Sequence, residues 1–186
     1  MSVIIGIDPS INSTGICVWD NEHNINKYYN IVSKVTKKLQ SFESSHIKIL
    51  SYNKSDIKDK EYSYKELAKT SNIYYICKHI RNILTILRPK SVIMEGVSYG
   101  SVGSAALVDL SGLNFAIRMV LADLEIPFKI VPPTAVKKFA TGNGQADKEL
   151  IIDAWKRLDK NMLNIKDIKV DDLADSFFLA HYQSET

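Results

Sequence analysis

Four carboxylates at three separated places in the chain have the clearest potential for chemistry. Asp8 and Glu95 each end a short apolar run. Asp172 and Asp175 stand three residues apart at the start of a third apolar segment. A charge buried without a partner destabilises a fold by several kcal/mol, so acids at such positions need a compensating group. Hard oxygen ligands of this kind suit Mg²⁺ or Mn²⁺. The pattern therefore predicts one site in which the four acids hold divalent metal ions.

The elements that must bring these acids together follow from the periodicity of apolar residues. β-Branched and apolar runs predict strands at residues 3–8, 14–19, 27–33, 91–95 and 128–131. Helical spacing predicts helices at 62–88, 104–124, 134–140, 146–159 and 171–182. The first three strands should form an antiparallel meander, and a further short strand at 47–52 stays open. This order predicts an α/β fold, a mixed five-stranded sheet flanked by helices, in one domain over residues 1–186 with a variable lysine-rich connection at about 34–62.

This arrangement would bring the four acids to one edge of the sheet. Open α/β sheets place functional residues beyond the carboxyl ends of their strands, and Asp8 and Glu95 occupy two such ends. Asp172 and Asp175 share one helix face, because residues three apart on a helix are neighbours. The last helix is therefore expected to present both acids to the edge where the strands end.

Composition and charge narrow the class of protein. The chain has 186 residues, 45% of them hydrophobic and 24% charged, as in ordinary globular proteins, and a formal net charge of +3. No apolar run reaches the ~20 residues of a membrane span, and the first residues do not resemble a secretory signal. Cys17 and Cys77 stand in apolar patterns, so reduced thiols in a cytoplasmic setting are expected. Basic residues gather at 34–60 and 137–157. A solvated surface explains most of them, and an acidic metal site with a phosphodiester substrate would also require basic segments around it, so charge alone does not decide the function.

Four motifs along the chain resemble those of one known family. They are VIIGIDPSINSTGICVWD at the start, the strand VIMEG, the stretch TAVKKFATGNGQADKELI and the final DDLADSFFLAH. In this order they are similar to the motifs of the RuvC family of Holliday-junction resolvases, and the resemblance implies a ribonuclease H-like fold. It covers most of residues 1–20 and 90–182. Residues 34–62 match no part of the family pattern, as in a divergent member such as a viral or phage-type one.

The resemblance also implies roles for individual residues. The family's catalytic, metal-binding acids correspond to Asp8, Glu95, Asp172 and Asp175. Asp171 is a rival to Asp172, because it lies four residues before Asp175; otherwise it would be an N-cap or first-turn acid. Lys148 falls where the family has a catalytic lysine near the scissile phosphate, and Lys137, with Lys138 as a competitor, falls at a second DNA-binding position. Tyr99 resembles an aromatic residue that the family uses in junction opening, although it stands one residue later.

The resemblance, together with these residues, implies a metal-dependent endodeoxyribonuclease that resolves four-way DNA junctions by paired symmetric nicks. Two Mg²⁺ ions about 4 Å apart, with Mn²⁺ as a substitute, would activate a water and stabilise the leaving oxygen, with Asp8 as the shared ligand. Two symmetric nicks call for a C2 homodimer, and the resemblance implies that helix 104–124 forms its interface.

Other functions stay open at this point. A related ribonuclease H-fold nuclease acting on RNA or on other branched DNA would carry the same acids. A non-catalytic junction-binding protein would not need all four. The spacing from Asp8 to Thr14 and Gly15 also resembles a phosphate loop of actin-like or sugar-kinase-like ATP-binding proteins. That fold needs two such domains, for which 186 residues are too few.

Overall fold

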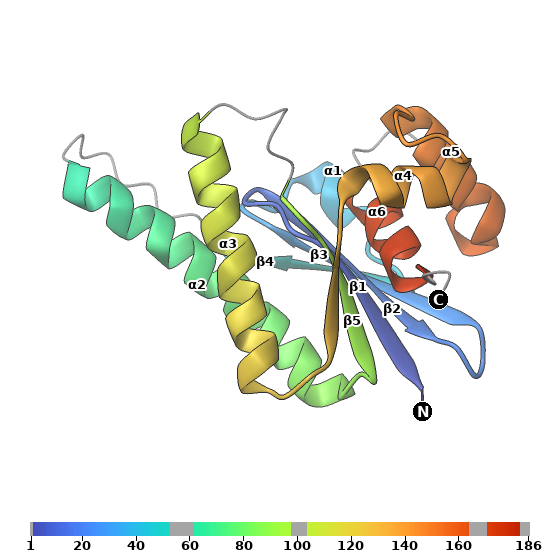
Figure 1. Cartoon of the computed structure of the whole chain (residues 1–186), viewed down its shortest axis with the longest axis horizontal. Coiled ribbons are helices and arrows are strands. Elements are labelled where there is room, and N and C mark those ends of the chain that lie inside the picture. Colours follow the sequence, from blue (N-terminus) through green and yellow to red (C-terminus); the bar gives the residue numbers. More distant parts are fainter. Residues whose placement is uncertain (1, 53–61, 98–103, 164–170, 183–186) are drawn as a thin grey trace.

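A six-stranded sheet forms the centre of the fold, with helices on both of its faces (Figure 1). The computed structural model describes residues 2–52, 62–97, 104–163 and 171–182. The strands are β1 (Val3–Asp8), β2 (Ser13–Asp20), β3 (Ile25–Val32), β4 (Ile47–Ser51), β5 (Ser91–Glu95) and β6 (Phe128–Val131). Their order across the sheet is β4-β3-β2-β1-β5-β6.

The sheet is mixed, as the sequence predicts. β1, β2 and β3 form the expected antiparallel meander. β4 pairs in parallel with β3, and β5 and β6 pair in parallel with β1 and with each other. The difference from the prediction is one additional strand, because the undecided segment at 47–52 forms β4 at the sheet edge. Its pattern is weak because only Ile47 among its residues is fully buried.

The helices divide between the two faces of the sheet. They are α1 (Lys37–Gln40), α2 (Tyr62–Leu87), α3 (Ser104–Asp123), α4 (Pro133–Thr141), α5 (Lys148–Leu158), the 3₁₀ helix η1 (Lys160–Met162) and α6 (Asp171–Ala180). α2 and α3 cover one face, and α4, α5 and α6 lie on the other (Figure 1). Each of the five predicted helices is present with boundaries close to those expected, and α1 lies within the connection at 34–62.

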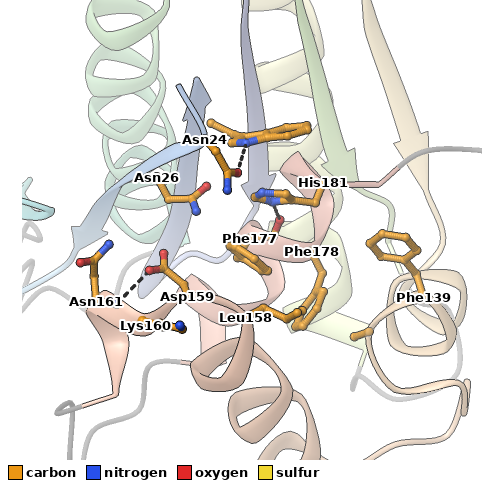
Figure 2. A pocket seen from close by; sticks show the side chains of 12 residues that line it. Asn24, Asn26, Phe139, Leu158, Asp159, Lys160, Asn161, Phe177, Phe178 and His181 are labelled. Atoms are coloured by element: carbon orange, nitrogen blue, oxygen red, sulfur yellow. Dashed lines mark hydrogen bonds between the residues drawn. The ribbon is translucent and has the colours of Figure 1, made fainter. Parts of the chain in front are cut away.

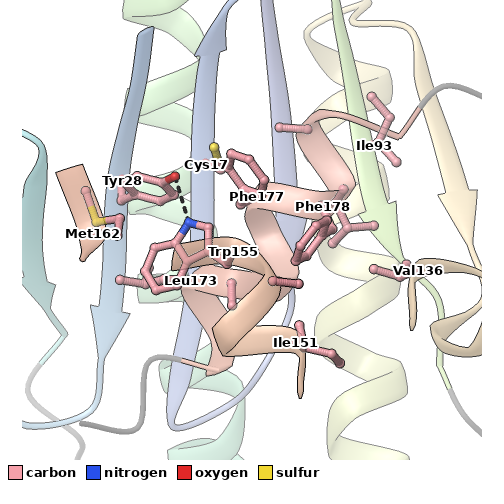
Figure 3. Packing of buried hydrophobic residues seen from close by; sticks show 14 of the residues in the cluster. Cys17, Tyr28, Ile93, Val136, Ile151, Trp155, Met162, Leu173, Phe177 and Phe178 are labelled. Carbon is pink, nitrogen blue, oxygen red and sulfur yellow. Dashed lines mark hydrogen bonds between the residues drawn. The ribbon is translucent and has the colours of Figure 1, made fainter. Parts of the chain in front are cut away.

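Alternation along the strands gives each face its own core. Ile5 and Ile7 of β1 point into the core formed with α2 and α3, whereas Gly6 and Asp8 point to the opposite face. On that opposite face the indole N–H of Trp155 donates to the Tyr28 hydroxyl at 3.0 Å, which packs α5 against the sheet (Figure 3). The two faces are therefore separate cores, and the strand ends between them are available for a site.

Helix α3 is buried on one side only. Leu113, Ile117 and Leu121 are fully buried against the sheet. Val108, Phe115 and Met119 are 67%, 59% and 72% exposed. Among the described residues it is the one helix whose length and composition would allow it to cross a membrane. One side of α3 packs on the sheet and α2, as in the core of a globular protein. The exposed apolar side is not explained by this packing.

Candidate active site

Two of the predicted acids meet at one edge of the sheet. β1 and β5 are parallel neighbours, so their carboxyl ends lie side by side. Asp8 and Glu95 are the last residues of these strands, and their carboxyl groups are hydrogen-bonded to each other. Asp8 is only 7% exposed, although it carries an ionisable group.

Helix α6 brings the other two acids to the same place because two glycines let it lie directly on the strands. A Cβ atom on Gly6 of β1 would come within 2.1 Å of the Ser176 carbonyl oxygen. A Cβ atom on Gly15 of β2 would come within 2.0 Å of the Asp172 carbonyl oxygen. Either distance is far inside a van der Waals contact, so only glycine fits at these positions. Gly15 is also the β2 residue that pairs with Asp8, which explains why the start of α6 lies at that acid.

Burial, and to a smaller extent mutual repulsion, raises the pKa of all four carboxyl groups. Burial raises the pKa of Asp8 well above its ordinary value, and the charges of Glu95, Asp172 and Asp175 raise it further. Burial likewise raises the pKa of Glu95. The pKa of Asp172 and that of Asp175 are each raised from 3.8 to about 7, again chiefly by burial. Desolvation and mutual repulsion are the two effects that a bound divalent cation would relieve.

The predicted lysines differ in their positions. Lys137 of α4 lies close enough to Glu95 and Asp175 for its charge to lower the pKa of both carboxyl groups. Lys148, the first residue of α5, forms an ion pair with Asp171. Lys138 is exposed and does not line the cleft that the acids share with the other two lysines. The structure thus separates Lys137 from its competitor.

The acids and lysines line one open cleft of about 440 Å³. Its walls come from the ends of β1 and β5, from α3 and α4, and from the beginnings of α5 and α6. Asp171 lines it too, but it forms an ion pair with Lys148, whereas Asp172 lies close enough to Asp8 for its charge to raise the pKa of that acid. Tyr99 lies outside the described residues. The cleft can therefore hold cations against the acids and an anionic group against the lysines.

Uncharged polar residues surround the acids, and their spacing in the sequence does not predict this role. The Asn114 side chain of α3 is 1% exposed and donates to the Glu95 main-chain carbonyl at 2.9 Å. The Ser13 hydroxyl donates to the amide oxygen of Asn30 at 3.0 Å and lies close enough to Asp172 to lower the pKa of that carboxyl group. These partners come from β2, β3 and α3, which are far apart in the sequence. Only the folded chain brings them to the acids.

A larger cavity, of about 700 Å³, lies at the other end of α6 (Figure 2). Aromatic rings form much of its wall. His181 stacks on Trp19 at 4.2 Å and lies 4.1 Å from Phe177, measured between ring centroids. Of the described residues that line it, none is one of the four acids. It is therefore separate from the candidate site.

A second acidic group lies at the turn between β2 and β3. Ligand atoms of Asp20, Glu22 and His23 come within 4.8 Å of one another. The Asp20 carboxylate accepts from the main-chain N–H groups of Glu22 and His23 at 3.1 and 3.3 Å and pairs with the His23 ring at 2.8 Å. Asp20 also pairs with Val3 across the ladder, so this turn is at the sheet edge opposite Asp8. These hydrogen bonds are those of a turn, and they explain why the three side chains lie together.

Comparison with known sequences identifies the family. The family model described as crossover junction endodeoxyribonuclease RuvC matches residues 4–181. The RuvC protein of Wolbachia sp. subsp. Brugia malayi (strain TRS) is 25% identical over 166 residues, which are 89% of this chain and 85% of that protein. The RuvC protein of Wigglesworthia glossinidia brevipalpis is 26% identical over 148 residues, which are 80% of this chain and 74% of that protein.

Comparison with solved structures supports the same fold. The structure of T. thermophilus RuvC in complex with a Holliday junction substrate aligns with a TM-score of 0.62 at 17% identity, over 97% of this chain and 91% of that one. A Thermus thermophilus RuvC structure aligns with a TM-score of 0.55 at 19% identity, over 96% and 90%. The ribonuclease H-like fold implied by the sequence motifs is thereby confirmed. Because the family model matches nearly the whole chain, the chain belongs to the RuvC family of crossover junction endodeoxyribonucleases.

Proposed function

We propose that the chain resolves four-way DNA junctions by metal-dependent hydrolysis in the cleft lined by Asp8, Glu95, Asp172 and Asp175. The observation that carries this proposal is the close burial of these four carboxyl groups, which raises the pKa of every one of them. Without cations such a cluster is unfavourable, whereas it is the donor set that Mg²⁺ or Mn²⁺ prefers. Two Mg²⁺ ions are the expected complement.

The acids have distinct roles in this proposal. Divalent cations bound in the cleft would supply an activated water and offset the charge that develops on the leaving oxygen. Asp8 is assigned as the shared ligand, because it is the most deeply buried of the four acids and the charges of the other three act on it. Asp172 is preferred to Asp171, because Asp172 lies near Asp8 and Asp171 is paired with Lys148.

The lysines would place the DNA backbone rather than read its sequence. Lys148 is the candidate for the charge nearest the scissile phosphate, and Lys137 would hold a phosphate from the α4 side of the cleft. Lys138, which does not line the cleft, is a weaker candidate for a DNA contact. Tyr99 keeps its proposed part in junction opening from the sequence resemblance alone.

The exposed side of α3 supports a homodimer. Val108, Phe115 and Met119 are spaced seven and four residues apart, so they form one stripe along the helix. Contiguous exposed apolar residues of this kind commonly mark a protein interface. A symmetric dimer would bury the stripe and present two clefts to a junction that is itself two-fold symmetric. A protein partner thus accounts for the apolar character of α3 without a membrane, which fits a cytoplasmic location.

Cleavage of a labelled four-way junction tests this proposal. We expect the wild-type protein to make paired nicks only when Mg²⁺ is present, and Asp8→Asn to lose cleavage while it still binds the junction. Cleavage in EDTA, or an unimpaired Asp8→Asn variant, would remove the metal mechanism. Equal cleavage of RNA or of unbranched DNA would favour the broader ribonuclease H-fold nuclease, and junction binding without cleavage would favour a non-catalytic protein.

A separate experiment tests whether Asp172 or Asp171 is the metal ligand. Asp172→Asn should weaken Mn²⁺ binding strongly, whereas Asp171→Asn should leave it largely in place, because Asp171 is held by a lysine. Isothermal titration of the metal in the absence of DNA measures both. The reverse order of affinities would assign Asp171 as the ligand.

A further inference from the structure

Asp171, which precedes the proposed metal ligand Asp172, forms an ion pair with Lys148, the proposed phosphate contact. Lys148 is the first residue of α5 and Asp171 is the first residue of α6, and their side chains form an ion pair at the mouth of the cleft. The two partners differ in environment. The Lys148 side chain is 74% exposed, whereas that of Asp171 is 14% exposed. The lysine can therefore swing toward a ligand, while the aspartate stays in place.

The position of the pair argues against a purely structural role. A lysine in the first turn of a helix is disfavoured by the helix dipole, so Lys148 does not stabilise α5 by being there. Because the lysine of this ion pair is largely exposed to solvent, water screens the attraction and the pair contributes little to stability. Both residues line the cleft with the four acids. The pair is thus weak enough to exchange partners and lies where an anionic ligand would arrive.

A DNA phosphate and Asp171 compete for the same ammonium group. If the phosphate takes Lys148, Asp171 becomes a further unpaired acid beside Asp172 and Asp175. A negative charge in that position repels the incoming backbone as well. We propose that Asp171 sets the affinity of the site for DNA by holding Lys148 until a phosphate displaces it. This inference rests on the proposed function, because it takes Lys148 as a phosphate contact.

The competition has a signature in the salt dependence of binding. Each lysine charge that neutralises a phosphate releases condensed cations, and the slope of log K against log[salt] steepens by about 0.9 per contact. In the wild-type protein a freed Asp171 attracts a cation while the phosphate releases one, so the net release at this position is small. Asp171→Asn removes the ion-pair partner of Lys148 from the start, and only the charges of Asp172 and Asp175 still act on the lysine. We therefore expect this variant to bind more tightly and with a slope steeper by about 0.9.

The experiment measures the dissociation constant for a four-way junction by fluorescence anisotropy, in EDTA and at several KCl concentrations. Asp171→Asn should bind severalfold more tightly than wild type at low salt. Glu149→Gln is the matched control, because it removes an exposed acid next to Lys148 that lies outside the cleft. It should tighten binding much less. Asp171→Ser is a second variant in case the asparagine alters the start of α6, and thermal melting checks that each variant is folded.

A double-variant cycle shows whether Asp171 acts through the lysine. In a Lys148→Gln background, Asp171→Asn should no longer tighten binding or steepen the slope. Equal tightening in that background, or equal effects of Asp171→Asn and Glu149→Gln, would overturn the inference while leaving the proposed function intact. A wild-type protein that binds the junction no better than linear duplex would instead overturn the proposed function, and the inference with it.

Discussion

Without divalent metal, the stability of this nuclease should fall as pH rises from about 4 to 7. Burial raises the pKa of Asp172 and of Asp175 from 3.8 to about 7. In the unfolded chain both carboxyl groups ionise near their ordinary value. Between these two pH values the folded protein holds protons that the unfolded chain has released, so the free energy of unfolding decreases as pH rises. The loss from these two acids is absent below about pH 4 and complete above about pH 7, and the raised pKa values of Asp8 and Glu95 act in the same direction.

The size of the effect follows from the pKa values of the folded and unfolded states. A tenfold difference in a proton's dissociation constant corresponds to about 1.4 kcal/mol, so the rise from 3.8 to about 7 corresponds to about 4 kcal/mol for one acid. The charge of Asp175 contributes to the raised pKa of Asp172, so the two amounts do not add in full. Burial remains the larger cause for each acid, so we expect the loss for the pair to lie between about 4 kcal/mol and about twice that amount. A domain of this size is typically stable by about 5–15 kcal/mol, so the loss is readily measured.

Urea unfolding in EDTA at pH 5 and pH 8 is the assay. Asp175→Asn should reduce the difference between the two pH values by the contribution of that acid, and Asp153→Asn, at an exposed position on α5, should leave it unchanged. His181 acts in the opposite sense, because burial lowers its pKa and its protonation destabilises the fold at acidic pH. All the variants share that contribution, so their differences isolate the acids. A wild-type protein that is as stable at pH 8 as at pH 5, with the same profile in Asp175→Asn, would refute the reasoning.

Three further predictions concern packing, phosphate binding and assembly. Gly15→Ala should destabilise the protein by about 1–3 kcal/mol, because its Cβ would meet the α6 main chain, and should weaken Mn²⁺ binding in a calorimetric titration. Gly112→Ala, with 3.5 Å to its nearest neighbour, should fold normally. Lys137→Ala should lower the single-turnover cleavage rate by about 100-fold, whereas Lys138→Ala should change it little; equal losses would contradict the assignment. Phe115→Glu should give a monomer in sedimentation equilibrium and separate the two nicks, and an unchanged dimer would show that α3 is not the interface.

The acids at the strand ends could be predicted because the signal is local. A buried strand gives a continuous apolar run, and a carboxylate that closes such a run stands out in the sequence, as Asp8 and Glu95 do. The order of strands and helices follows from the same periodicity. β4 is harder to predict, because an edge strand with one fully buried residue has no comparable pattern.

The choice between Asp171 and Asp172 could not be derived from spacing. Either residue shares a helix face with Asp175, since three and four residues both amount to about one turn. In the structure the choice depends on Gly15, whose missing side chain lets the main chain at Asp172 touch β2. That contact joins residues from opposite ends of the sequence. The pairing of Asp171 with Lys148 is equally non-local, because it depends on how two helix starts meet.

The glycine contacts also explain why metal and fold should be coupled in this protein. Gly6 and Gly15 hold α6 so close to β1 and β2 that Asp172 and Asp175 cannot move away from Asp8 without losing the packing of the whole helix. Repulsion among the acids therefore lowers the stability of the folded protein, because the helix cannot shift to relieve it. Cations that bind the acids would remove this repulsion, so metal binding and the stability of α6 should rise together.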